Sequence, residues 1–195
     1  MDHVLQATPS PSDGRARILA GALASLRVDG LTGFSLQRAS IQAGVSKALV
    51  IYHFHTKAAL LAAMVEWLTH RVLARERGMM DRDSTTHVLD DLWQYLDAEH
   101  EQGEYAILLV LADAGLPGLR DAAARSLEQR RSHAQRSVEG IFQRLQLIPR
   151  LPLAHLTEVE QAFREGLLLR MAQGAIATPR AAFDMFWLAV LSQSA

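Results

Sequence analysis

The chain has 195 residues, of which 49% are hydrophobic, and its 20 basic and 21 acidic side chains leave a formal net charge of -1. That apolar content supports a sizeable core and excludes a disordered tail, while the balanced charge excludes a strongly basic coating protein. Cysteine is absent, which excludes a disulfide scaffold, a cysteine zinc site and a cysteine nucleophile. We expect a cytoplasmic protein with neither a signal peptide nor a membrane-spanning segment.

Almost every segment is predicted to be helical. Ala, Leu, Arg, Gln and Glu dominate, apolar residues recur at spacings of three and four, and the alternation typical of strands is absent. The first 14 residues are predicted to form a flexible arm. In chain order, the expected helices cover residues 13–29, 36–42, 47–53, 57–78, a stretch opened by Ser84, 104–114, 119–147, 157–174 and 178–193. The sequence therefore predicts an all-α protein of about nine helices.

Short polar side chains mark the expected helix starts. Ser35, Ser46 and Thr56 can each cap a helix N-terminus with a side-chain oxygen. Thr157 followed by Glu160 has the spacing of a capping box, and Thr178 precedes a first-turn proline.

The balanced net charge conceals an uneven distribution. Residues 1–57 carry six basic and three acidic groups, whereas the remainder carries 14 basic and 18 acidic groups. The two lysines of the chain, Lys47 and Lys57, both lie in the first part. A basic head on an acidic body predicts a polyanionic partner for the head.

Residues 15–61 have the pattern of a helix-turn-helix. Two short predicted helices are joined by Ala43-Gly44-Val45-Ser46, in which Gly44 permits a tight bend and Ser46 caps the second helix. Beyond that helix, Tyr52, His53 and Lys57 offer hydrogen bonds and charge to phosphate oxygens. This stretch predicts a DNA-binding unit whose second short helix fits the major groove.

These residues resemble the TetR family of bacterial transcriptional regulators. The chain departs from the residues usual in that family at Ala48, where glycine is usual, at Ile51, where tyrosine is usual, and at Ala39-Ser40, where an isoleucine-alanine pair is usual. The matching residues are Ala43-Gly44-Val45-Ser46-Lys47, Tyr52-His53-Phe54, Lys57 and Leu60-Leu61, with Gly30, Leu31 and Ser35 at the spacing of the family.

The resemblance implies a helix-turn-helix DNA-binding domain over residues 15–61 and a helical bundle for ligand binding and dimerisation over residues 62–195. Such a homodimer binds a palindromic operator on double-stranded DNA and is mostly a repressor, released by a small-molecule effector. Residues implied to hold phosphates are Ser35, Ser46, Tyr52, His53 and Lys57. Residues implied to lie at base edges are Arg38, Lys47 and Leu49, with the small Ala48 allowing close approach.

Aromatic and apolar residues of the body are candidates for an effector pocket, although each one alone is more typical of core packing. The candidates are Trp67, Trp93, Tyr105, Leu109, Phe142, Phe163 and Met171. Arg130 and Arg164 are able to pair with an acidic ligand, but ion pairs between helices are the favoured interpretation.

The last two predicted helices have apolar faces wider than a small body needs. We interpret them as a four-helix dimer seam, with a core within one chain as the alternative. The candidate interface residues are Leu167, Leu168, Phe183, Phe186, Trp187 and Val190.

Two other classes of function are considered. An enzyme on a helical bundle is not favoured, because the sequence has no glycine-rich phosphate loop, no paired Glu-x-x-His motifs and no nucleophile elbow. A protein-interaction adaptor that has lost DNA binding is the alternative. We expect no catalytic residue, no cofactor and no metal site; for His53 and His55, phosphate contact and solvent exposure are favoured over metal binding.

Overall fold

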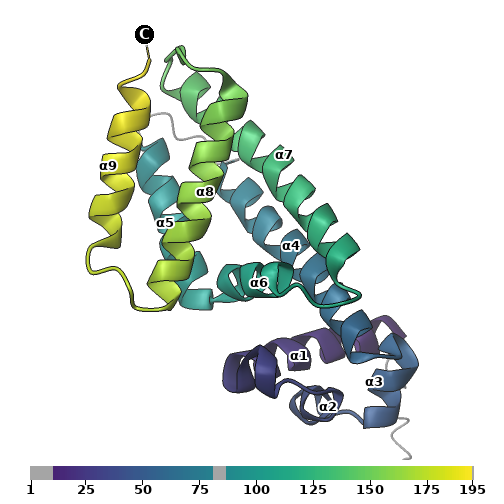
Figure 1. Cartoon of the computed structure of the whole chain (residues 1–195). Coiled ribbons are helices and arrows are strands. Elements are labelled where there is room, and N and C mark those ends of the chain that lie inside the picture. The colour runs from purple at the N-terminus through teal and green to yellow at the C-terminus, as the bar shows by residue number, and fades with distance from the viewer. Residues whose placement is uncertain (1–10, 81–86, 195) are drawn as a thin grey trace, which may run out of the picture. The chain divides into compact units, whose positions relative to one another are not determined.

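The computed structural model describes residues 11–80 and 87–194, and within them it confirms the predicted all-α fold with nine helices (Figure 1). The first four helices are α1 (Pro11–Gly33), α2 (Leu36–Ala43), α3 (Lys47–Phe54) and α4 (Lys57–Met80). The remaining five are α5 (Val88–Gln102), α6 (Glu104–Asp113), α7 (Arg120–Arg144), α8 (Leu153–Ala172) and α9 (Pro179–Leu191).

The chain folds as two compact units. The first comprises residues 1–64 and 116–119, and the second comprises residues 65–115 and 120–195. We call them the head unit and the body unit. Since α4 runs through residue 64, its first two turns belong to the head unit and the rest to the body unit.

The core of the head unit is apolar. Residues three and four apart on α1 turn inward, and α1 packs on α2 and α3. Its buried side chains include Ile18, Leu19, Ala22, Leu23, Phe34, Ala39, Val50, Phe54, Leu60 and Leu61.

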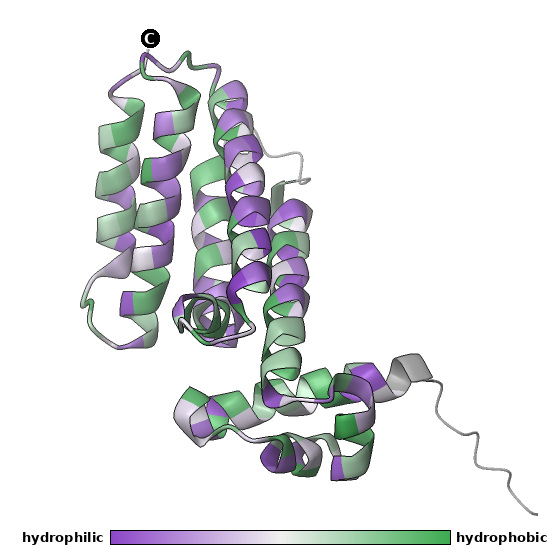
Figure 2. Cartoon of the chain, turned by 45° about the vertical axis from the view of Figure 1, so that its right-hand side comes forward, coloured by the Kyte–Doolittle hydropathy of each residue, from purple (hydrophilic) through white to green (hydrophobic). Residues whose placement is uncertain are grey.

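The body unit is a bundle in which α6 runs across the long axes of its neighbours (Figures 1 and 2). Figure 2 shows that hydrophobic and hydrophilic residues both occur along its long helices. Helix α7 packs most extensively on α8, while α6 contacts α5, α7 and α8. No single helix among the described residues is long and apolar enough to cross a membrane; α3 and α4 reach that length and composition only as a pair bent by 72°.

Several helix boundaries differ from the predicted ones. Helix α1 begins at Pro11, so the last residues of the predicted arm are helical, because proline suits a first turn. Gly30 interrupts this helix as expected, with φ 62° and ψ -179°, but a further turn reaches Gly33. The predicted cap Ser84 lies outside the described residues, as do residues 1–10.

The predicted capping box at Thr157 and Glu160 is wrong. Helix α8 already begins at Leu153, after Pro152, and both side chains are buried in its interior. Thr157 Oγ1 donates to the carbonyl oxygen of Leu153 at 2.9 Å, a bond that a hydroxyl makes inside a helix. At α9, Thr178 does occupy the N-cap position before Pro179, but its side chain makes no capping hydrogen bond.

Candidate nucleic-acid interface

The turn between α2 and α3 has the geometry that the sequence predicts. Gly44 takes the left-handed conformation, with φ 62° and ψ 37°, which a side chain would oppose. Its N–H donates to the carbonyl oxygen of Ile41 at 3.1 Å, and the N–H of Val45 donates to that of Ser40 at 3.0 Å. These bonds end α2 and set the direction of α3.

Serine side chains cap both helices of the motif, as predicted. Ser35 Oγ accepts from the N–H of Arg38 at 3.2 Å, and Ser46 Oγ accepts from the N–H of Leu49 at 3.1 Å. Thr56 Oγ1 caps α4 in the same way, accepting from the N–H of Ala59 at 3.1 Å. Since each hydroxyl accepts its bond, its proton stays available to a phosphate oxygen.

Two further residues position this turn, and the sequence pattern did not identify either of them. Arg17 on α1 donates from Nη2 to the carbonyl oxygens of Ala43 at 3.3 Å and Gly44 at 3.1 Å. At Gly21, also on α1, an added Cβ would lie 2.4 Å from the backbone nitrogen of Ala43. The only signal in the sequence is the position of Gly21 in the middle of a helix. A glycine there destabilises the helix unless close packing requires it.

Helix α3 has one buried and one exposed face. Val50 and Phe54 are buried, whereas Lys47 and Ala48 are exposed and Tyr52 is 75% exposed. Leu49 is half-buried, and the His53 ring meets Tyr52 edge-on with centroids 5.2 Å apart. The exposed face thus combines a cation with a phenol and an imidazole at the helix end.

Two of the predicted DNA-contacting cations already have partners in the chain. Lys57 Nζ donates to the carbonyl oxygen of Phe34 at 2.7 Å and lies 5.6 Å from the centre of the Phe34 ring. Arg38 forms an ion pair with Asp29 while its side chain stays 56% exposed. Both groups retain further N–H donors, so their roles toward DNA stay predictions.

In the body unit, the predicted pocket residues make apolar contacts within the chain. Trp93 packs on Phe183, with ring centroids 5.4 Å apart, and Phe163 stacks on Phe186 at 4.0 Å. Phe142 belongs to a separate apolar cluster with Val138 and Leu156. Trp67 lies under the guanidinium of Arg71, while Tyr105, Leu109 and Met171 are buried. Most of the set therefore takes part in core packing, and its role in an effector pocket stays a prediction.

The predicted dimer-interface residues also need correction. Leu167, Leu168, Phe183 and Trp187 are at most 3% exposed within the single chain, so they form its own core. Phe186 and Val190 are half-buried. The large apolar side chains that α8 and α9 expose are Val159, Met185 and Leu188. The helical period explains the error, because neighbouring apolar residues on α9 point to opposite sides.

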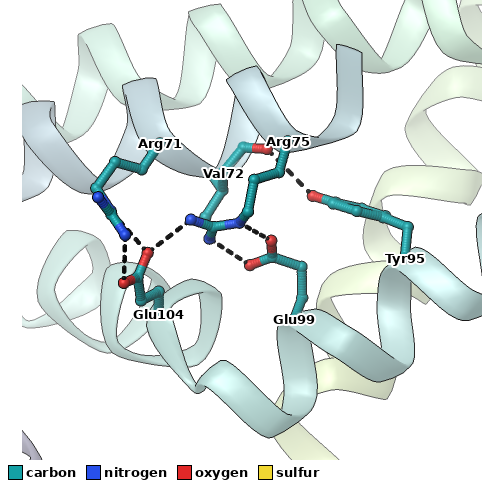
Figure 3. Close-up of polar contacts among 6 residues, drawn as sticks. All are labelled: Arg71, Val72, Arg75, Tyr95, Glu99 and Glu104. Atoms are coloured by element: carbon teal, nitrogen blue, oxygen red, sulfur yellow. Dashed lines mark hydrogen bonds and ion pairs between the residues drawn. The ribbon is translucent and has the colours of Figure 1, made fainter. Parts of the chain in front are cut away.

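A network of ion pairs ties α4 to α5 and α6 (Figure 3). Arg71 makes two hydrogen bonds of 3.0 Å to the Glu104 carboxylate, and Arg75 bonds to both Glu104, at 2.8 Å, and Glu99, at 2.7 Å. Burial opposes ionisation of Glu104, but the two arginines outweigh it and lower the pKa of that carboxyl. Beside the network, the Tyr95 hydroxyl donates to the carbonyl oxygen of Val72 at 3.4 Å.

Further inside the body unit lies a group of buried polar side chains, which we call the buried polar cluster. It consists of Glu76 on α4, Tyr105 on α6, Arg130 and His133 on α7, and Glu160 and Arg164 on α8. All six are at most 6% exposed. From the sequence, Tyr105 is a pocket candidate, the two arginines are candidates for ion pairs, and Glu160 is expected at a helix start. Glu76 and His133 fall among polar residues of ordinary helical appearance, so no pattern singles them out.

Arg164 is the centre of the cluster. Its Nη1 donates to Glu76 Oε1 at 2.7 Å, and its Nε lies 3.3 Å from Glu160 Oε1. Burial opposes the charge, but Glu160 and Glu76 raise the pKa of Arg164. Burial in turn raises the pKa of Glu160 to about 7, and it lowers the pKa of His133, with Glu76 acting in the opposite direction. Among the described residues, no set of three potential ligands is arranged to hold a metal ion.

The geometry defines a class of protein: an all-helical chain with an N-terminal helix-turn-helix, whose second helix is exposed on one face, and a separate helical body. Residues 18–64 match the family model described as bacterial regulatory proteins, tetR family. The helix-turn-helix of the chain therefore matches the TetR family, and solved TetR-family structures share the fold of the whole chain.

One curated relative and several solved structures are similar to the chain. The HTH-type transcriptional regulator CymR from Pseudomonas putida is 31% identical over 122 residues, and the match spans 60% of this chain and 59% of CymR. A TetR transcription regulator from Haloarcula marismortui shares the fold with a TM-score of 0.74 and 19% identity, over 94% of this chain and all of that one. NalD, the secondary repressor of the MexAB-OprM multidrug efflux pump in Pseudomonas aeruginosa, has a TM-score of 0.64 and 18% identity, over 95% of this chain and 98% of its own.

Proposed function

We propose that the protein is a ligand-responsive DNA-binding transcriptional regulator. The observation that carries this proposal is α3: an eight-residue helix, capped by Ser46, that exposes Lys47, Ala48 and Tyr52 on one face and is held by its other face. The major groove admits an α-helix with one exposed face. In that groove, Lys47 donates to base edges, and Tyr52 and His53 contact the flanking phosphates.

The further parts of the proposal rest on the similarity to the TetR family. The protein acts as a homodimer on a palindromic operator in the cytoplasm, with the head unit as the DNA-binding domain and the body unit as the domain for effector binding and dimerisation. It represses transcription, as NalD does, until a small molecule bound in the body releases it. The exposed Val159, Met185 and Leu188 support a partner surface on α8 and α9.

DNA binding is tested by selecting duplexes from a random pool and measuring their affinity by fluorescence anisotropy at several salt concentrations. We expect a selected site with two-fold symmetry, and Lys47→Glu should weaken its binding by roughly tenfold or more and flatten the salt dependence. Light scattering on the same sample should give the mass of two chains.

The matched control is Arg150→Glu, an exposed residue of the body unit that undergoes the same change of charge. It should retain the affinity of the unchanged protein. If the pool yields no preferred sequence, or if the two variants lose affinity equally, the proposed function is wrong and an adaptor without DNA binding takes its place.

A further inference from the structure

The buried polar cluster contains an unusual number of hydrogen-bonding atoms without a partner among the described residues. They are Glu76 Oε2, Tyr105 OH, Arg130 Nε, both ring nitrogens of His133, Glu160 Oε2 and Arg164 Nε. Buried polar atoms in native proteins nearly always have a partner, and each one left alone costs about 1–3 kcal/mol. Seven such atoms, on α4 and on the mutually packed α6, α7 and α8, indicate a site that forms hydrogen bonds with molecules from outside the chain, either water or a ligand.

The atoms belong to one continuous site. Glu76 links α4 to α8 through Arg164, at 2.7 Å, and to α7 through the Ser137 hydroxyl, at 2.9 Å. His133 Nε2 lies 3.5 Å from Glu76 Oε2, without the geometry of a hydrogen bond. Tyr105, whose buried hydroxyl also has no partner among the described residues, lies on α6, which packs on α7 and α8.

Arg130 and Arg164 face three carboxylates, those of Glu76, Glu160 and Glu165, so the charges of the cluster balance when Glu160 holds its proton, as its raised pKa of about 7 allows. Arg164 is paired with Glu76 and Glu160, and Arg130 is paired with Glu165, which also accepts from Gln161 at 2.9 Å. What the site lacks is therefore hydrogen bonds and not charge. A charged ligand would then add an uncompensated ion to a site that is at most 6% exposed, which is unfavourable.

The free atoms require a ligand with both kinds of hydrogen-bonding group. Arg130 Nε is a donor, as is Arg164 Nε, which lies 3.3 Å from Glu160 Oε1 without forming a hydrogen bond; two carboxylate oxygens are acceptors, and the phenol and imidazole can be either. A hydroxyl or a primary amide donates and accepts at neighbouring atoms, which an ether or a hydrocarbon does not.

We infer that the buried polar cluster is the effector-recognition site and that the effector is an uncharged molecule carrying hydroxyl or amide groups. This inference rests on the proposed function for its regulatory meaning, but the site can be tested without DNA.

Four probes with the same ring and different charge test the inference: benzyl alcohol and benzamide, which are uncharged, and benzoate and benzylamine, which are charged. Binding to the full chain is measured by calorimetry and by the shift of the thermal midpoint. We expect at least one uncharged probe to bind and to raise the midpoint, and both charged probes to bind more weakly.

The two buried tyrosines supply a matched pair of variants. Tyr105→Phe removes a hydroxyl that has no partner, and we expect it to weaken binding of the uncharged probe by roughly tenfold, the value of one hydrogen bond. Tyr95→Phe removes a hydroxyl that already donates to Val72, and it should leave probe affinity unchanged. Without a probe, Tyr105→Phe should unfold at the same or a higher temperature than the unchanged protein, because it removes an unsatisfied group.

The inference is overturned if neither uncharged probe binds, if a charged probe binds as tightly as its uncharged counterpart, or if Tyr105→Phe retains the full affinity. None of these outcomes depends on DNA. If the anisotropy experiment shows no preferred DNA sequence while an uncharged probe still binds, the proposed function is contradicted but the inferred binding site is not.

Discussion

The head and body units differ in the kind of polar side chain that they bury. In the described part of the head unit, the buried polar side chains are two serines: Ser25, which donates to Asp29, and Ser40, which donates to the carbonyl oxygen of Gln37. The described body unit buries seven acidic, basic or imidazole side chains, namely Glu76, Glu99, Glu104, Arg130, His133, Glu160 and Arg164.

The two cores therefore differ in how readily protonation or a ligand can change them. An apolar core closed by capped helices has one good arrangement, which suits a surface that must present α3 in a constant orientation. A core with buried charges is costly, and it responds to protonation or to a ligand that supplies the missing bonds. The comparison leads to three predictions, ordered by the size of the expected effect.

The largest effect is expected from Glu76→Gln in the body unit. This change removes the charge opposite Arg164 while keeping the shape, and it should lower the free energy of unfolding by about 3–5 kcal/mol, as breaking a buried pair does. Chemical denaturation followed by tryptophan fluorescence reports the body unit, because Trp67, Trp93 and Trp187 all lie in it.

The matched control for Glu76→Gln lies on the same helix. Glu66 pairs with Arg125 at 2.5 Å, but both side chains are about half exposed, so Glu66→Gln should cost at most about 1 kcal/mol. If the two variants lost the same free energy of unfolding, the buried ion pair of Glu76 would contribute no more to stability than the exposed pair of Glu66.

A smaller effect is expected from the pH dependence of the body unit. Burial raises the pKa of Glu160 from 4.5 in the unfolded chain to about 7, although Arg164 opposes the shift and Glu76 and Glu165 add to it. The folded state therefore binds the proton more tightly. This stabilisation, roughly 3 kcal/mol, is fully present below pH 4.5 and is lost as the pH rises through 7.

The variant Glu160→Gln should remove this part of the pH dependence and stabilise the body unit above pH 7, as measured by denaturation at successive pH values. Glu158→Gln, on the exposed side of the same helix, should keep the profile of the unchanged protein. A profile that is identical in all three proteins would show that Glu160 does not titrate in this range.

The smallest effect is expected in the head unit, from Gly21→Ala. The new Cβ would come within 2.6 Å of three atoms of Ala43, so α1 and the turn must separate, at about 1–3 kcal/mol. Calorimetric unfolding should show the loss in the head unit, and the affinity for the selected duplex should fall with it.

Gly166→Ala is the control for that substitution, because an added Cβ on α8 meets no described atom within 4 Å. Replacing this helical glycine should raise stability by about 0.5–1 kcal/mol. If Gly21→Ala were also stabilising, the close approach of α1 to the turn would not exist in solution.

Much of the head unit could be predicted because its determinants are local. Gly44, Ser35 and Ser46 act on residues within four positions of themselves, and their caps and turn are present in the structure as expected. Arg17 and Gly21 were missed because they act across 22 to 27 positions of sequence, and nothing in their own neighbourhood indicates a partner on the turn.

The all-helical fold, the order of the helices and the capped helix-turn-helix could be predicted from the sequence, because periodicity, caps and breaks are encoded within a few residues. Only the tertiary structure decided which apolar residues of α8 and α9 face the core, and which polar residues are buried. Glu76, His133 and Glu160 have ordinary helical neighbours in sequence, and they become one site only when α4, α7 and α8 pack together. Burial and long-range pairing are properties of the packed bundle, and no local pattern specifies them.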